Sequence, residues 1–259
     1  MLHTASRVLV ILSVLMAAAR GGESALTGRQ VMEKARRANE PKDEIVQVEM
    51  RLIDKGGRVM TRRLRIEYLK APDGLDRSLI RFHYPRRMKG TGLLTLERKR
   101  GNDDQWLYLV NFRRVRRIAA DAKTERFVQS DFTYEDLQPE DLDDNTYKLL
   151  RSEEVDGRPC HIVEALPKSP GGGYARREIA VDAERWLPLR TLYHDADGRV
   201  IKTQTVANVE RHGRYWRPAL VTMTDRRIGH TTEFKVTERT IDGGIDAEHF
   251  TPRFLSSGR

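Results

Sequence analysis

The sequence predicts an all-β or β-rich α+β fold, with about ten or eleven antiparallel strands in one meander sheet. Apolar and polar residues alternate with a period of two in run after run. Turn signals, many containing glycine, separate these runs at intervals of roughly 8 to 15 residues. Helical periodicity is confined to short stretches. A sheet with this many strands is large enough to curl.

The first element of the predicted body is a short helix. Thr27 is suited to cap its N-terminus, and we expect the helix to run through Arg36 and to end before Pro41. Its apolar stripe consists of Val31, Met32 and Ala35.

A long antiparallel hairpin is predicted over residues 45–69, with its turn at Lys55-Gly56-Gly57. Each strand has one apolar and one polar face. A third strand with the same alternation follows over residues 78–84. The apolar faces of the three strands consist of Val46, Val48, Met50, Leu52, Leu64, Ile66, Tyr68, Ile80, Phe82 and Tyr84.

Further hairpins follow in the second half of the chain. Their turns are predicted at Asp156-Gly157, Asp197-Gly198 and His212-Gly213. A last strand is expected near residues 232–240. The segment 120–147 shows no strand alternation and is expected to be a loop with one or two short helices that could cover the open mouth of the sheet. Residues 171–173 form a second flexible break, with a hairpin tip as its simplest interpretation.

Residues 1–19 have the three parts of a secretory signal peptide, with Arg7 before an apolar stretch and Ala17, Ala18 and Ala19 after it. Cleavage is expected after Ala19, and a retained N-terminal anchor is the alternative. The apolar stretch is too short to span a bilayer. We therefore expect export to the periplasm and a single domain over residues 20–259.

Composition limits the classes of protein that need be considered. Charged residues make up 33% of the 259 residues, and the net charge is +9. The single cysteine excludes an intramolecular disulfide framework. The basic balance suits nucleic acid, anionic lipid headgroups or an acidic partner. Because export argues against a genomic DNA binder, we expect no nucleic-acid partner.

The common catalytic signatures are missing from the sequence. It contains no Gly-x-Ser-x-Gly elbow, no His-Glu-x-x-His pair and no Gly-rich phosphate loop. The seven histidines are scattered singly. A lipid hydrolase that brings Asp and His residues together from distant strands stays an alternative, with His83 and His194 as its candidates. We expect no enzyme and no catalytic residue.

No cofactor or metal is expected. The acidic clusters at Asp103-Asp104 and at Asp141, Asp143 and Asp144 lack the mid-loop glycine and terminal glutamate of an EF-hand, which favours solvated loops. Cys160 is expected to be a buried structural thiol.

The strongest local charge feature is the basic run Arg113, Arg114, Arg116 and Arg117. If extended, the run is charged on both faces and should lie at a rim or an edge of the sheet. Such a rim could contact an acidic partner or phospholipid headgroups, where each exposed basic residue contributes about 1 kcal/mol. Protection of a sheet edge by charge is the alternative.

The apolar strand faces point to a hollow. The sequence supplies few amphipathic helices to cover these faces, so a strongly curved sheet could enclose a lipid-sized cavity, closed by short helices from the N-terminus and from residues 120–147. The ten apolar residues of the first three strands would line it. A fully packed core is the alternative.

Several segments together resemble the outer-membrane lipoprotein-sorting (LolA-like) family. They are residues 39–41 (Asn-Glu-Pro) after the helix, 62–64 (Arg-Arg-Leu), 103–109 (Asp-Asp-Gln-Trp-Leu-Tyr-Leu), 113–118, 130–137 (Ser-Asp-Phe-Thr-Tyr-Glu-Asp-Leu) and 186–190. The resemblance covers essentially the whole predicted mature chain. It implies an open half-barrel sheet wrapped over helices, a concave apolar pocket for acyl chains and a periplasmic carrier role without catalytic residues.

The leading hypothesis is therefore a carrier of lipoprotein acyl chains or another lipid. Its partners would be the acylated lipoprotein or lipid, an inner-membrane RND-type exporter and, transiently, a membrane surface. Each buried CH₂ contributes roughly 0.8 kcal/mol, so an acyl chain could be held without polar specificity. A non-enzymatic adaptor that docks onto an inner-membrane exporter, with a fully packed sheet, is the second hypothesis.

Overall fold

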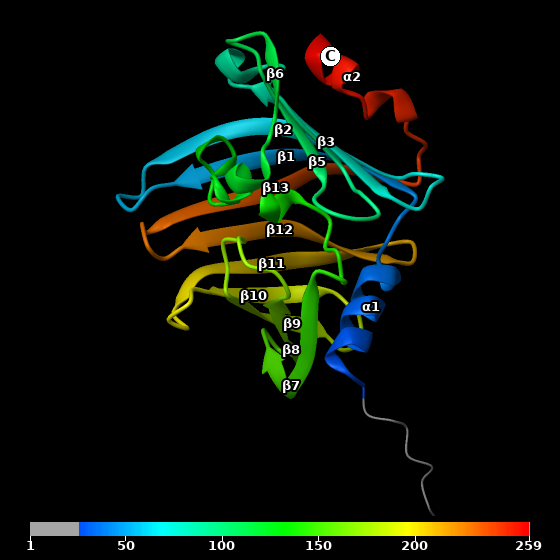
Figure 1. The fold of residues 1–259 in the computed structure, drawn as a ribbon, viewed down its shortest axis with the longest axis vertical. Coiled ribbons are helices and arrows are strands. Elements are labelled where there is room, and N and C mark those ends of the chain that lie inside the picture. The colour runs from blue at the N-terminus through cyan, green and yellow to red at the C-terminus, as the bar shows by residue number, and fades with distance from the viewer. Residues whose placement is uncertain (1–25, 259) are drawn as a thin grey trace, which may run out of the picture.

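The computed structural model describes residues 26–258, and the predicted signal peptide at 1–19 lies outside the described residues. These residues form one open, 13-stranded antiparallel sheet (Figure 1). The first six strands are β1 (Asp43–Ile53), β2 (Val59–Lys70), β3 (Asp76–Tyr84), β4 (Gly92–Leu96), β5 (Asp104–Leu109) and β6 (Arg114–Arg117). The other seven are β7 (Asn145–Val155), β8 (Arg158–Pro167), β9 (Arg176–Asp182), β10 (Pro188–His194), β11 (Val200–His212), β12 (Tyr215–Asp225) and β13 (His230–Ile241).

The sheet consists of two meanders that meet at its centre. Strands β1 to β6 lead outward to one edge, and β7 to β13 return from the other edge until β13 pairs with β1. In this central pair Met50 lies opposite Phe234, and Val48 lies opposite Val236. Residues far apart in the sequence therefore share one apolar surface.

The sheet curves into a half-barrel whose concave face is covered by two segments (Figure 1). Helix α1 (Gly28–Ala38) lies over β7 and β8, where its buried side chains Val31, Met32 and Ala35 pack against the apolar residues of β8 and β9. The Thr27 side chain caps this helix, with Gln30 completing a capping box. The convex face of β3 to β5 is covered by the C-terminal helices η5 (Ala247–His249) and α2 (Pro252–Ser257).

The second cover of the concave face is the connection between the two meanders, which we call the covering segment (residues 119–138). It contains three short 3₁₀ helices, η2 (Ala120–Thr124), η3 (Phe127–Gln129) and η4 (Glu135–Leu137). Its aromatic residues Phe127, Phe132 and Tyr134 are buried against strands of both meanders. A further 3₁₀ helix, η1 (Arg86–Met88), joins β3 to β4.

The predicted fold class is confirmed, with more strands than expected. The helix, the first hairpin and the three predicted turns after residue 150 are present. Strands β6 and β9 raise the number to 13, because β6 is only four residues long and charged on both faces, and β9 ends in a continuous buried run instead of an alternating one. Within residues 26–258, no helix is long and apolar enough to cross a membrane.

Candidate functional site

A hollow of about 400 Å³ opens on the concave face where the two meanders meet. We call it the concave hollow. Its floor is apolar, because the strand residues that face this side are aliphatic or aromatic. The floor consists of Val46 and Val48 of β1, Ile66 of β2, Val221 of β12, and Phe234 and Val236 of β13. This volume lies in the range of pockets that bind small molecules.

Charged side chains surround the mouth of the concave hollow, and they are paired with one another. Glu44 lies between two arginines, with its Oε1 atom 2.9 Å from Arg239 Nε and 3.3 Å from Arg217 Nε. On the opposite wall Asp76 accepts hydrogen bonds from Tyr68 and Lys70, both at 2.8 Å. Burial, reinforced by the negative charge of Asp76, raises the pKa of Tyr68. The phenol therefore stays neutral and donates its hydrogen bond.

The covering segment packs beside the hollow, against the lining residue Phe234. The ring of Phe132 stacks on that of Phe234, with centroids 4.7 Å apart. Phe127 packs against Phe82 at 5.8 Å and against Tyr134 at 6.0 Å. The apolar surface of the sheet continues beneath this segment, so its displacement would lengthen the hollow along β1, β2 and β3.

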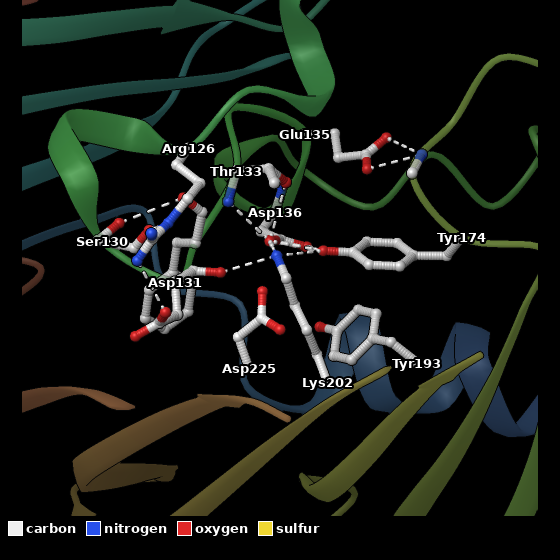
Figure 2. Close-up of polar contacts among 12 residues, drawn as sticks. Arg126, Ser130, Asp131, Thr133, Glu135, Asp136, Tyr174, Tyr193, Lys202 and Asp225 are labelled. Carbon is white, nitrogen blue, oxygen red and sulfur yellow. Dashed lines mark hydrogen bonds and ion pairs between the residues drawn. The ribbon is translucent and has the colours of Figure 1, made fainter. Parts of the chain in front are cut away.

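A buried polar network holds the covering segment on the sheet (Figure 2). The Lys202 side chain is 1% exposed, and its Nζ atom donates to the backbone carbonyl of Asp131 at 2.7 Å and to the Tyr174 hydroxyl at 2.8 Å. Tyr174 in turn donates to Asp136 at 2.9 Å. Thr133 donates to the same carboxylate through its backbone N–H and its hydroxyl, both at 2.8 Å. Burial, together with the charge of Asp136, raises the pKa of Tyr174.

The Asp131 side chain anchors the middle of the covering segment to β13. Its fully buried carboxylate lies 2.6 Å from both His230 Nδ1 and Thr232 Oγ1, and 3.0 Å from Arg126 Nη2. Such buried charges are stable only when paired and hydrogen-bonded. These contacts of Asp131 therefore hold the covering segment closed, and they would have to break before the segment could open.

The ten residues predicted to line a cavity lie in three environments. Val46, Val48, Ile66 and Tyr68 border the concave hollow. Met50, Leu52, Leu64, Ile80 and Phe82 are buried in the core of the concave face, where the covering segment packs. Tyr84 is a correction, since it lies on the opposite face. A bulge places Tyr84 opposite Arg63 rather than in line with Phe82, and its side chain is 51% exposed.

The predicted basic rim lies at one edge of the sheet. Arg114, Arg116 and Arg117 belong to β6, which is the edge strand, and Arg113 lies in the preceding turn. Arg117 is paired with Asp104, and Arg116 lies 3.9 Å from Glu125. The other two arginines are exposed.

The candidates for other chemistry are not assembled into a site. His83 is at the end of β3 and is exposed, whereas His194 is 5% exposed on β10 and contacts Arg176. Cys160 is buried, as expected, and burial raises the pKa of its thiol. Among residues 26–258, no group of three His, Cys, Asp or Glu side chains is arranged to hold a metal ion.

Two buried cationic residues of the concave face escaped prediction. Arg62 and Lys202 both lie on the concave face, and both are buried. On β2 the same face presents Met60, Arg62 and Leu64 in succession. The burial of Arg62 could have been predicted from the sequence, because Arg62 alternates in phase with the apolar residues of its strand.

The comparisons with known proteins agree with this geometry. A family model described as an uncharacterized protein matches residues 74–257. An outer-membrane lipoprotein-sorting protein domain from Vibrio parahaemolyticus is 29% identical, with a TM-score of 0.84 over 88% of this chain and 98% of that one. A DUF1329 family protein from Desulfovibrio piger is 28% identical, with a TM-score of 0.83 over 88% and 97% of the two chains.

A LolA superfamily protein from Nitrosomonas europaea shares the fold. It is 18% identical, with a TM-score of 0.70 over 89% of this chain and all of that one. None of the curated proteins compared with the chain is significantly similar to it in sequence. The fold is the open antiparallel sheet that these neighbours share. The chain belongs to the family whose model matches residues 74–257, and its structural neighbours are outer-membrane lipoprotein-sorting, DUF1329 and LolA superfamily proteins.

Proposed function

We propose that this protein is a periplasmic carrier that holds an acyl chain in the concave hollow. The observation that carries the proposal is an apolar hollow of about 400 Å³ on the concave face of the sheet. The structural neighbours point the same way, since one of them is an outer-membrane lipoprotein-sorting protein domain. In this proposal residues 1–19 direct export, and residues 20–259 form the single carrier domain.

The charged mouth and the apolar floor suit an amphiphile. Each CH₂ group transferred from water to the floor contributes roughly 0.8 kcal/mol, so hydrocarbon alone can supply the affinity. The cargo would be an acylated lipoprotein, or another lipid handed on by an inner-membrane exporter. Its polar end would stay near the ion pairs around Glu44 and Asp76, where water has access.

Loading a long chain would require the covering segment to move. Phe132 occupies the concave face next to the hollow, and its displacement from Phe234 would extend the apolar floor toward Met50. The network around Lys202 opposes this motion. The carrier would thus have a closed state held by buried polar contacts and an open state in which cargo replaces the aromatic side chains.

A carrier role also fits the lining of the concave hollow better than hydrolysis does. Among the described residues that line it there is no serine, cysteine or histidine. Its carboxylates Glu40, Glu44 and Asp76 are engaged in ion pairs. The hollow itself favours the carrier over an adaptor with a fully packed sheet.

The proposal is tested by native mass spectrometry of protein taken from the periplasm, together with uptake of a fluorescent fatty acid. We expect lipid adducts and saturable uptake. The substitution Val221→Trp should fill the floor and weaken uptake at least about tenfold. Val59→Trp, at an exposed position on the first hairpin, is the matched control and should bind like the wild type. A lipid-free protein without uptake, or normal uptake by Val221→Trp, would reject the proposal.

A further inference from the structure

The net positive charge of the chain comes from the strands at one edge of the sheet. Residues 77–96 and 105–120 contain η1, β4, β6 and all of β3 and β5 except their first residues, Asp76 and Asp104. They hold five and four Lys or Arg residues and no Asp or Glu. The remaining 47 − 9 = 38 basic residues equal the 38 acidic residues of the whole chain. Residues 97–104, between the two segments, hold three basic and three acidic residues, so the region 77–120 carries a charge of 12 − 3 = +9, equal to that of the whole chain.

The exposed members of this basic region gather where two turns meet. Helix η1 follows β3, and the β5–β6 turn follows β5, so the antiparallel order places both at the same end of the sheet. The ion pairs found within residues 26–258 leave several of these side chains without an acidic partner. These are Arg86, Arg87, Lys89, Arg113 and Arg114.

A second hollow, of about 490 Å³, lies between these turns and the tip of the covering segment. We call it the edge hollow. Its walls combine apolar and cationic side chains, among them Arg62, Arg87, Met88, Leu109, Phe112 and Val128. The edge hollow and the concave hollow lie toward opposite ends of β2, as the positions of Arg62 and Tyr68 show.

Arg62 is a buried cation with no carboxylate partner among the described residues. Its side chain is 3% exposed, and its Nη1 atom donates to the Val128 carbonyl at 2.5 Å. Nη2 is hydrogen-bonded only to the Met60 sulfur, at 3.8 Å, and Nε has no hydrogen-bond partner. The guanidinium carbon lies 6.0 Å from the centroid of the Phe82 ring. Burial lowers the pKa of Arg62, and the nearby charge of Arg87 lowers it further. A buried guanidinium of this kind is expensive unless an anion compensates it.

The backbone around the edge hollow is strained. Val128 and Gln129 have φ values of 40° and 67°, and Arg113 has a φ of 47°. A β-branched residue such as Val128 rarely adopts this left-handed conformation. Backbone strain of this kind concentrates at binding sites, where it fixes the orientation of functional groups.

Phe112 gives this end of the molecule an exposed aromatic tip. It lies in the β5–β6 turn beside Arg113, and its side chain is 74% exposed, the largest value among the exposed large apolar residues described. Aromatic side chains flanked by basic residues are typical of protein surfaces that enter the interfacial layer of a membrane. Because Phe112 is exposed to water, it takes no part in the interior of the carrier.

We propose that this end of the sheet docks onto anionic phospholipid headgroups at a membrane surface. In this arrangement Arg62 and Arg87 receive the headgroup phosphate in the edge hollow, Phe112 enters the interfacial layer, and Arg113 and Arg114 contact neighbouring headgroups. An anionic lipid fits this surface, because its phosphate would supply the negative charge that Arg62 lacks and its acyl chains would lie next to Phe112. The docking surface is separate from the concave hollow.

The test is co-sedimentation with phosphatidylcholine vesicles prepared with and without phosphatidylglycerol. We expect binding only to the anionic vesicles, weakening as salt is added. Because each basic residue near such a surface strengthens binding about fivefold, Arg113→Gln/Arg114→Gln should weaken it about 25-fold. The matched control is Lys168→Gln/Lys235→Gln, which removes the same charge from exposed positions elsewhere.

The edge hollow and the aromatic tip are tested separately. Arg87→Gln should reduce the preference for phosphatidylglycerol. The fluorescence of a Phe112→Trp variant should shift to the blue on anionic vesicles, whereas that of Leu166→Trp, an exposed position on β8, should not. Fatty-acid uptake should be unchanged in all these variants, which separates this proposal from the carrier function.

Three results would overturn the proposal. They are equal binding to neutral and anionic vesicles, equal binding by the arginine variant and its lysine control, and no blue shift of Phe112→Trp on vesicles that bind the protein. Binding of an acidic protein at this surface, without binding to vesicles, would assign the surface to a protein partner instead.

Discussion

Phe132 stacks face to face on Phe234, with ring centroids 4.7 Å apart and ring planes inclined by 10°. The first residue belongs to the covering segment and the second to the floor of the concave hollow, on β13. This pair joins the movable part of the proposed carrier to the surface that would receive hydrocarbon. A change to this pair should therefore alter both the stability of the closed state and the volume of the hollow.

Removing the Phe132 ring should destabilise the protein and enlarge the hollow. Phe132 is 4% exposed, and a buried Phe→Ala substitution usually costs about 3–5 kcal/mol. Since the space left is next to the hollow, a fatty acid should fill it. We expect Phe132→Ala to lower the melting temperature and to recover more of it on addition of fatty acid than the wild type gains. A variant that fatty acid does not stabilise would place Phe132 away from the binding surface.

Lys202 should be more important to stability than Tyr174. Replacing Lys202 by Met leaves the Asp136 carboxylate buried without its cation, and breaking such a pair typically costs about 3–5 kcal/mol. Tyr174→Phe removes one hydroxyl and should cost about 1–2 kcal/mol. Urea unfolding of both variants measures the difference. Equal losses would mean that the ammonium group adds nothing beyond its hydrogen bonds.

Asp103 should make stability depend on pH. Burial, with added repulsion from Glu97, Asp141 and Asp144, raises its pKa from 3.8 to about 6. The folded state then holds this proton more tightly than the unfolded state, so the contribution of Asp103 to stability falls as the pH rises from about 4 to about 6. Asp103→Asn keeps the oxygen that accepts a hydrogen bond from the Arg98 backbone.

We expect Asp103→Asn to be more stable than the wild type by about 1 kcal/mol at pH 7, after allowance for solvent screening, and equal to it below pH 4. Thermal unfolding across this range provides the measurement, and Asp121→Asn, at an exposed position, is the control. A stabilisation that persists unchanged at pH 3 would show that the effect does not come from ionisation.

Arg81 should hold the C-terminal helix on the convex face. Its buried guanidinium donates to the carbonyls of Gly90, Phe254 and Leu255, at 3.1, 3.1 and 2.7 Å. We expect Arg81→Met to cost about 1–3 kcal/mol and to speed hydrogen exchange in residues 245–258. Arg77→Met, a half-exposed position on the same strand, is the control. Unchanged exchange in that segment would rule out an anchoring role.

Local patterns predicted much of this fold. The period of two identified the first hairpin, and the Thr27 cap with its apolar stripe identified α1. Local patterns could not predict contacts between residues that are far apart in the sequence. The pairing of β1 with β13 joins residues nearly 200 positions apart, and no local signal specifies it. The misplacement of Tyr84 has the same origin, because a single bulged residue reverses the face of everything beyond it.

The candidate site was predictable to a similar extent. The strand faces indicated an apolar surface that needed a cover, and the segment 120–147 was the evident candidate. The alternation could not show which part of that surface remains open, since this depends on where Phe127 and Phe132 pack. The ion pairs that fix the cover, such as Lys202 with Asp136, connect residues on separate elements and become visible only in three dimensions.

The central claim is that hydrocarbon binds on the concave floor, and photo-crosslinking with a diazirine fatty acid tests it most directly. Peptide mapping after irradiation should find the label in β1, β2, β12 and β13, near Val48, Ile66, Val221 and Val236. Unlabelled fatty acid should compete for these positions. Labelling confined to the convex face or to the sheet edges, or no competition, would contradict the account.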